Sequence, residues 1–431
     1  MRVSHCRALV PVIVLCTPVR LAAQEWAAPV SRDSALQVLV TEVTERNPGL
    51  TGRRVALDAA RHRIRPAGAL PDPVLRVGWM DPFKRWHTVT QIPVSLEQEF
   101  PWPGTLGART AFARAGREAA AADVGATRRE LVTAVGAGYY RMQYLATALD
   151  ALQRQRRLLE AAVQISTTRY ATGAAPQSDP LQARLARDRL DAEEAVLTGE
   201  RAAALAAINA LRNRPPSESV AVTPLDPAGL RAAAAPLAPT ESHVALALRS
   251  HPSVAARRAT VVQAGQAVRI ERLAARPAFA LMVEYQYQGR VPITNQNLPD
   301  FGSVFLGLRL PIWAWRKQHR LADAARADSA AAAATLEDAE AQLARDVSET
   351  WARAEAARRR LELLVDGVLP GARATVESVV RSYQVGRTEF VTVIAVEDAL
   401  FRAETETAAA AADYQLQLLI LRELTAEETP Q

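Results

Sequence analysis

The side chains that could do chemistry are spread along this 431-residue sequence in a way that excludes catalysis. The six histidines form no pair at i, i+4, and both cysteines lie among the first 23 residues (His5, His62, His87, His243, His251 and His319; Cys6 and Cys16). Metal sites and nucleophile–base pairs need such residues at close spacing, and the sequence contains no phosphate-binding loop either. We therefore expect no enzymatic activity, no metal site and no cofactor.

The charged residues with the clearest pattern alternate with apolar residues in short segments. These segments are residues 74–80, 89–100, 278–288 and 303–310. Alternation with period two predicts strands that have one apolar and one polar face. The charged residues of the polar faces are Glu97, Glu99, Glu284 and Arg309. They line a water-filled pore, or they are merely solvated residues of its lumen with no selective role.

Each pair of predicted strands is followed by very long predicted helices. Residues 105–170 read as one helix, which at 1.5 Å per residue is a rod of roughly 100 Å. From Leu131 to Val163 its apolar residues alternate at spacings of four and three, and only Gly138 and Arg156 interrupt them. That is the seam of a coiled coil. The chain turns at Gly173 and returns as a second predicted helix over residues 180–212.

The whole pattern occurs twice. Asn47-Pro48 matches His251-Pro252, and a second pair of predicted strands is followed by predicted helices over residues 318–383 and 391–423. We assign residues 24–230 to the first repeat and residues 231–431 to the second. Pro370, between two glycines, predicts a kink in the second long helix that the first lacks.

Residues 1–23 have the pattern of a secretory signal peptide cleaved after Ala23, because a short apolar run follows Arg2 and Arg7 and ends in small residues. A retained anchor is the alternative. The formal net charge of +6 comes from arginines spread along the helices, so we expect no binding to nucleic acid.

Four strands with an apolar face cannot close a membrane barrel, for which about eight strands is the smallest number. Aromatic residues gather at the ends of the predicted strands, where the two interfaces of a bilayer would place them. The strands and the seams of the long helices therefore predict an oligomer around an axis, and an axis through a barrel is a pore.

With these features the chain resembles the TolC family of outer-membrane efflux proteins, from about Asp33 to its end. The resemblance is carried by the duplicated repeat, by Pro71-Asp72-Pro73 before the first strand, by the run Gln98–Gly104 after the second, and by a Tyr-x-x-Gly sequence at each hairpin tip. It implies a mainly α-helical homotrimer, in which a 12-strand outer-membrane barrel (four strands per protomer) continues into a long periplasmic coiled-coil tube.

The function implied by the resemblance is a passive exit duct of a tripartite system. The duct would sit in outer-membrane lipid and receive drugs or metal ions from an inner-membrane pump and a periplasmic adaptor. Pro71-Asp72-Pro73 and the Phe-Pro-Trp-Pro-Gly run are most similar to the branch that serves heavy-metal pumps. The alternative is a periplasmic coiled-coil adaptor or scaffold without a pore, which would carry a single hairpin rather than two strand pairs.

The resemblance also implies a gate at the periplasmic tips. Asp179 and Tyr383 match residues that are hydrogen-bonded in the closed state, and Arg387 lies one place before the family's tip arginine. Gly173 and Gly386 match adaptor-facing tips, although glycine at a tip is first of all a turn residue. Asp179 precedes Pro180 and has a second interpretation, as the N-cap of the return helix. The family's two acidic positions correspond to Thr392 and Ala395, so the acidic ring is lost here.

Overall fold

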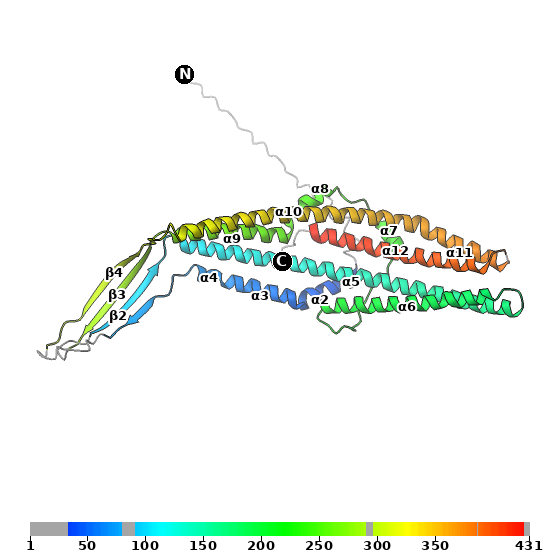
Figure 1. Cartoon of the computed structure of the whole chain (residues 1–431), viewed down its shortest axis with the longest axis horizontal. Helices are drawn as coiled ribbons and strands as arrows, with labels where there is room; N and C mark the ends of the chain where they lie inside the picture. The colour runs from blue at the N-terminus through cyan, green and yellow to red at the C-terminus, as the bar shows by residue number, and fades with distance from the viewer. Residues whose placement is uncertain (1–32, 80–90, 290–295, 386, 426–431) are drawn as a thin grey trace, which may run out of the picture.

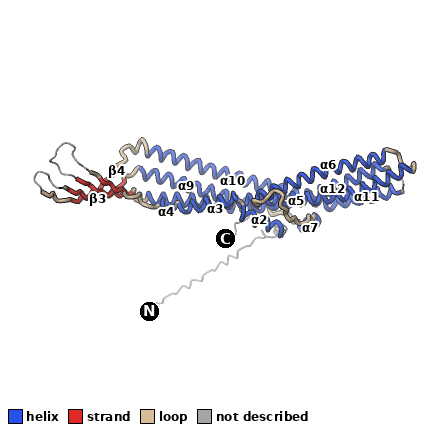
Figure 2. The backbone as a smooth tube through the Cα atoms, turned by 90° about the horizontal axis from the view of Figure 1, so that it is seen from below, coloured by secondary structure: helices blue, strands red, loops and turns tan. Residues whose placement is uncertain are grey.

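The computed structural model describes residues 33–79, 91–289, 296–385 and 387–425. Figure 1 shows an elongated molecule with its strands at one end and the turns of two helical hairpins at the other. Figure 2, seen from another side, shows helices filling the length between them. The expected signal peptide lies outside the described residues.

The first copy of the repeat has three short helices, a strand pair and a long helical hairpin. Its elements are α2 (Ser34–Arg46), α3 (Pro48–His62), α4 (Ile64–Ala67), β1 (Val74–Val77), β2 (Gln91–Phe100), α5 (Thr105–Ala171) and α6 (Ser178–Leu211). Strand β1 is shorter than the predicted 74–80, since the residues that follow Val77 up to Trp79 are not strand.

The second copy repeats this order after the short helix α7 (Pro227–Ala233). Its elements are α8 (Thr240–Ser250), α9 (Pro252–Ala274), β3 (Ala278–Gln288), β4 (Phe301–Arg309), α10 (Gln318–Leu363), the π-helix η1 (Leu364–Val368), α11 (Leu369–Gln384) and α12 (Phe390–Thr425). The predicted boundary at residues 230/231 falls inside α7, and where the two repeats divide stays a prediction.

The two helix starts matched in the sequence are capped in the same way. The Asn47 side chain accepts a hydrogen bond from the Leu50 N–H (3.1 Å), and the His251 Nδ1 accepts one from the Ser253 N–H (3.3 Å). In both helices proline follows at the first position, where its missing N–H costs nothing.

The four strands form one antiparallel sheet in the order β1-β2-β3-β4. The register places Leu75, Leu96, Val283 and Val304 side by side across it, while Glu97 and Glu284 lie on the other face. The apolar face is the more exposed one: Val304 is 71% and Leu306 79% accessible, whereas the polar-face residues of β3 are all partly covered. A soluble protein has the opposite arrangement.

Helix α5 runs the length of the helical part and packs against α3 and α9 toward the sheet and against α6 and α12 toward the tips. Val135, Leu145 and Leu152 of its predicted seam are fully buried.

The two interruptions of the seam have physical causes. A Cβ at Gly138 would come within 2.7 Å of Ile208, so glycine lets α6 approach. Arg156 reaches Asp191 and Glu194 of α6.

The predicted interruption of the second long helix is a π-helix at Leu364–Val368, where the Leu369 N–H bonds the carbonyl of Leu364 five residues back. This shift of the hydrogen-bond ladder accommodates Pro370, which has no N–H to donate. Arg231 of α7 fixes the segment from outside, with ion pairs to Glu362 (3.1 Å) and Asp366 (2.8 Å).

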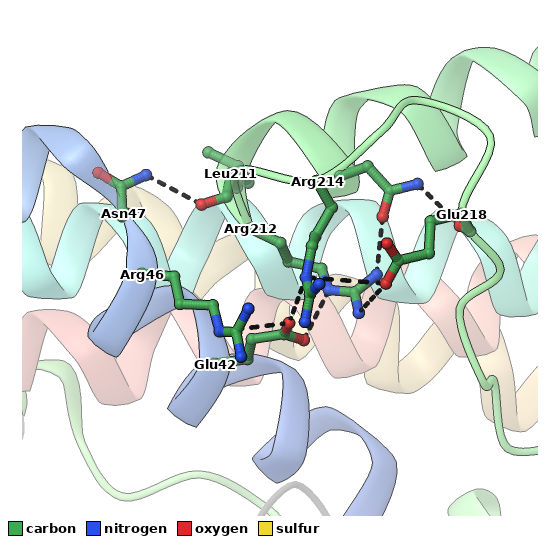
Figure 3. A network of polar contacts seen from close by, with 8 residues as sticks. Glu42, Arg46, Asn47, Leu211, Arg212, Arg214 and Glu218 are labelled. Atoms are coloured by element: carbon green, nitrogen blue, oxygen red, sulfur yellow. Dashed lines mark hydrogen bonds and ion pairs between the residues drawn. The ribbon is translucent and has the colours of Figure 1, made fainter.

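A charged network joins α2 to the end of α6 (Figure 3). Glu42 accepts hydrogen bonds from Nε of Arg212 (2.8 Å) and of Arg214 (2.9 Å), and Arg212 also contacts Glu218 (3.3 Å). Burial alone raises the pKa of Glu42, but the hydrogen bonds and charges of the two arginines outweigh it, so the pKa lies below its ordinary value of 4.5. The network therefore stabilises the fold while Glu42 is ionised.

We expect Glu42→Gln to lower the free energy of unfolding by about 2 kcal/mol, because Arg212 is buried and would lose its main partner. A guanidinium titration of the detergent-solubilised protein, followed by tryptophan fluorescence, measures this. The loss should be full above pH 4.5 and shrink as the pH falls through the lowered pKa of Glu42, because protonation then removes the same charge from the wild type. Glu45→Gln, an exposed position on the same helix, is the matched control. Equal effects of the two substitutions would contradict a role for the network.

Candidate functional site

The polar face of the sheet brings the predicted pore-lining residues together. Glu97 forms an ion pair with Arg76 of β1, and Glu99 forms one with Arg309 of β4 at 2.7 Å. Glu284 lies between Ser95 and Ser303 in the register, and within the described residues it has no ion-pair partner. Two of the three predicted carboxylates are therefore neutralised.

Small residues make the Glu99–Arg309 pair possible. The two side chains lie on β2 and β4, with β3 between them, and Arg309 faces Ala278 while Glu99 faces Ala280. Because the alanine side chains project only a short way from β3, the Arg309 side chain can extend across that strand to Glu99. The carboxylates were found from their alternation with apolar residues, but Arg76 sits in a strand of only four residues and its pairing required the register.

The two hairpin tips end their long helices in the same way. At the first, Gly173 has a φ of +72°, its N–H bonds the Tyr170 carbonyl (3.0 Å), and the Ala174 N–H bonds the Arg169 carbonyl (2.8 Å). This is the glycine-terminated C-cap that a left-handed residue allows. At the second, the Arg387 N–H bonds the Ser382 carbonyl (2.9 Å) with the same spacing. Gly386 itself lies outside the described residues.

The predicted hydrogen bond between Asp179 and Tyr383 is not formed in the protomer. The Tyr383 hydroxyl oxygen is buried without a hydrogen-bond partner, and the Asp179 carboxylate accepts only from the neighbouring Ser178 hydroxyl (3.3 Å). The N-cap interpretation of Asp179 is wrong, since α6 begins at Ser178, two residues before the predicted start at Pro180, and Gln177 occupies the cap position. Asp179 lies in the first turn, where its charge favours the helix dipole.

The Tyr383 hydroxyl has no hydrogen-bond partner within the described residues because the ring of this residue points between the two hairpins. The ring lies 5.6 Å from that of Phe390, and the Arg169 guanidinium lies over it at 5.2 Å. The three side chains line a cavity of about 470 Å³, which we call the tip cavity. Its other lining residues are Leu158, Leu159, Ala161, Ala162, Ile165, Val380, Val393, Ile394 and Glu397.

Arg387 is exposed and has no ion pair within the described part of the chain. Thr392 and Ala395, the positions of the family's acidic residues, are exposed on α12. Glu397, two residues beyond Ala395, instead points inward and is only 8% accessible.

Glu397 had a signal in the sequence that was missed. Phe390, Ile394, Glu397 and Phe401 follow one another at spacings of four, three and four, so Glu397 occupies a seam position among apolar residues. Arg169 gave no such signal, since its role depends on a contact between two hairpins that are distant in the sequence.

The described residues contain no candidate metal site. No group of three or more His, Cys, Asp or Glu side chains is placed to hold a metal ion in residues 33–79, 91–289, 296–385 and 387–425. Within the same ranges no helix is long and apolar enough to cross a membrane.

Comparison with known proteins adds a family and a fold. The family model described as outer membrane efflux protein matches residues 39–214 and 244–427. No curated protein sequence matches. Among solved structures, the outer-membrane channel OprN is 18% identical with a TM-score of 0.79, over 94% of this chain and 92% of that one. VceC of Vibrio cholerae is 18% identical with a TM-score of 0.76, over 93% and 98%.

A third similar structure is the open state of the MtrE channel of Neisseria gonorrhoeae, at 19% identity and a TM-score of 0.74 over 91% of this chain and 89% of that one. At such identities the likeness shows the fold, and the fold predicted from the sequence, TolC-like with long helices and a strand sheet, is confirmed.

We expect Tyr383→Phe to leave the free energy of unfolding unchanged or slightly higher, because the hydroxyl it removes is buried and unbonded. Tyr383→Ala should lower it by about 2 kcal/mol through the loss of the contacts with Phe390 and Arg169. Guanidinium titration of both variants measures the difference. If Tyr383→Phe were as damaging as Tyr383→Ala, the hydroxyl would have a partner after all.

Proposed function

The chain belongs to the outer membrane efflux protein family, and from that premise we propose that it is the outer-membrane channel of a tripartite efflux system. In this role it is a passive exit duct that receives its substrates from an inner-membrane pump and a periplasmic adaptor. It has a binding and conducting role and no catalytic one.

One observation carries the proposal: in β2 and β3 the apolar face of the sheet is more exposed than the charged face. Leu96, Val283 and Leu306 are among the exposed residues, and on the reverse face lie the Arg76–Glu97 and Arg309–Glu99 ion pairs. In a lipid bilayer the first face contacts hydrocarbon and the second faces water in a lumen. A periplasmic adaptor or scaffold without a pore, the alternative function, gives no reason for this arrangement.

The edges of the sheet support a trimer. Among the described residues β1 and β4 each pair on one side only, which leaves a row of backbone N–H and C=O groups free on each edge. Such groups cannot stay unpaired in hydrocarbon. Pairing β4 of one protomer with β1 of the next closes a barrel, and three protomers give 12 strands. Each protomer then adds two helical hairpins to a periplasmic tube.

The exported substrate is not selected by a site in the barrel, since a water-filled tube needs none and the pump does the selecting. Drugs and metal ions both remain within the proposal. Pro71-Asp72-Pro73 and the Phe-Pro-Trp-Pro-Gly run support the heavy-metal branch.

We place the gate at the hairpin tips. Asp179 lies in the first turn of α6 and Arg387 lies between α11 and α12, and Figure 1 shows the turns of these two hairpins at the end of the molecule opposite the sheet. Both residues are charged, and neither forms an ion pair within the described protomer. In a ring of six tips they are available to pair between neighbouring hairpins. Tyr383 supports the gate through its packing on Phe390. Gly173 forms a turn that faces the adaptor in this proposal, and the adaptor-facing role of Gly386 stays a prediction.

Val283→Arg should abolish the trimer, whereas Glu284→Arg should leave it intact. The two residues are neighbours on β3 but point to opposite faces, so only the first places a charge against lipid, at a cost of roughly 2–4 kcal/mol per protomer near the middle of the membrane. Light scattering of the detergent-extracted protein measures the assembly. Loss of the trimer in both variants would refute the assignment of the faces.

Asp179→Asn and Arg387→Gln should each raise the single-channel conductance in planar bilayers several-fold, because either removes a charge-assisted bond between tips worth about 1.5–3 kcal/mol. Tyr383→Phe, which removes no bond, is the matched control and should conduct like the wild type. If both charge variants also conducted like the wild type, the gate would lie elsewhere.

A further inference from the structure

The tip cavity is an elongated apolar slot between the two hairpins. One wall is the end of α5, from Leu158 to Arg169, and the other is formed by α11 and the start of α12. Leu158 and Arg169 are eleven residues apart on α5, which corresponds to about 16 Å of helix. Most of the side chains between these ends are aliphatic, and Ile165 at the wall is half exposed, which leaves the slot open to molecules from outside the protomer.

The slot has a charged residue at each end, but only one of the two has an interaction partner in the described part of the protomer. At the end near the tip, Arg169 already lies over the ring of Tyr383. At the inner end, Glu397 is 8% accessible, and no hydrogen bond or ion pair holds its carboxylate within the described part of the chain. It lies seven residues beyond Phe390 on α12, about 10 Å of helix away from the Arg169 end.

Glu404, seven residues beyond Glu397 on α12, is a glutamate with an ordinary structural role and serves as a comparison. Glu404 forms ion pairs with Arg154 (2.9 Å) and with Arg373 (3.3 Å). Glu397 has neither, and burial together with the nearby Glu404 raises the pKa of its carboxyl. An ionised group in such a place is costly unless a cation compensates it.

From this geometry we propose that the tip cavity is a binding site for a hydrophobic organic cation. The ammonium or other cationic group lies against the Glu397 carboxylate, and an aromatic or aliphatic body fills the slot between α5 and α12. Pockets of this volume with a few placed polar groups among apolar walls are typical of small-molecule sites.

An anion is the less suitable ligand. Arg169 is the cationic residue of the lining, and its guanidinium is occupied by the ring of Tyr383, so an anion would have to compete for it while its own charge faced Glu397 along the slot. A neutral molecule would fill the apolar walls but leave the carboxylate uncompensated.

Three probes of the same shape test the choice of charge: 1-naphthylmethylammonium, the neutral 1-naphthylmethanol, and the anion 1-naphthylacetate. Calorimetric titration of the full-length protein in nanodiscs at pH 8, with empty nanodiscs subtracted, gives the three affinities. We expect the ammonium to bind at least tenfold more tightly than the alcohol, and the anion to bind most weakly.

Two variants locate the site. Glu397→Gln keeps the shape and should reduce the ammonium to the affinity of the alcohol, while Glu406→Gln, an exposed acid on the same helix, should change nothing. Ile165→Trp fills the slot from a half-exposed position and should weaken the ammonium and the alcohol alike. Equal binding of all three probes, preference for the anion, or full ammonium binding to Glu397→Gln would each overturn the proposal, and none of these results depends on whether the protein conducts.

Discussion

Backbone hydrogen bonding in hydrocarbon is the constraint on which the rest of this molecule depends. A four-stranded sheet with an exposed apolar face has two edges whose N–H and C=O groups need partners, and water cannot supply them in a bilayer. When the sheet edges pair with those of other copies of the chain, these backbone groups find hydrogen-bond partners. The paired sheets then form a ring around an axis. In the proposed trimer, helices that continue from a closed ring of strands surround the same axis. Within the protomer their seams already pack against one another.

The middle of the helical part and its tip end differ in how firmly they are held. Around the middle, α2 is joined to the end of α6 by the Glu42 network, α7 holds η1 through Arg231, and Gly138 lets Ile208 pack without a gap. Toward the tips the hairpins enclose a cavity, with an unbonded hydroxyl and an unpaired carboxylate on its walls. The proposed gate therefore lies on the tip side of the π-helix at Leu364–Val368, beyond the bonds that hold the middle.

Local sequence patterns predicted the elements but not what they do to one another. Alternation and heptad spacing located the sheet residues and the seam of α5, and Pro370 marked the interruption of the second long helix, because each of these follows from nearby residues. The tip was predicted less well. The Asp179–Tyr383 bond came from a resemblance, and it is not formed within the protomer, because the tyrosine ring packs against Phe390 and Arg169 in the cavity. Arg76 and Glu397 were missed because their roles depend on strand register and on the packing of two hairpins.

Cross-linking between β1 and β4 tests the central claim most directly. The only cysteines are Cys6 and Cys16, so Leu75→Cys on β1 can be combined in turn with Val304→Cys, Leu306→Cys and Leu308→Cys on β4, with each single variant as control. Within one protomer β1 and β4 are three strand spacings apart, about 14 Å, which is too far for a reagent that spans about one spacing. A closed barrel predicts covalent dimers and trimers on a denaturing gel for at least one pair. Monomers alone for every pair would contradict it.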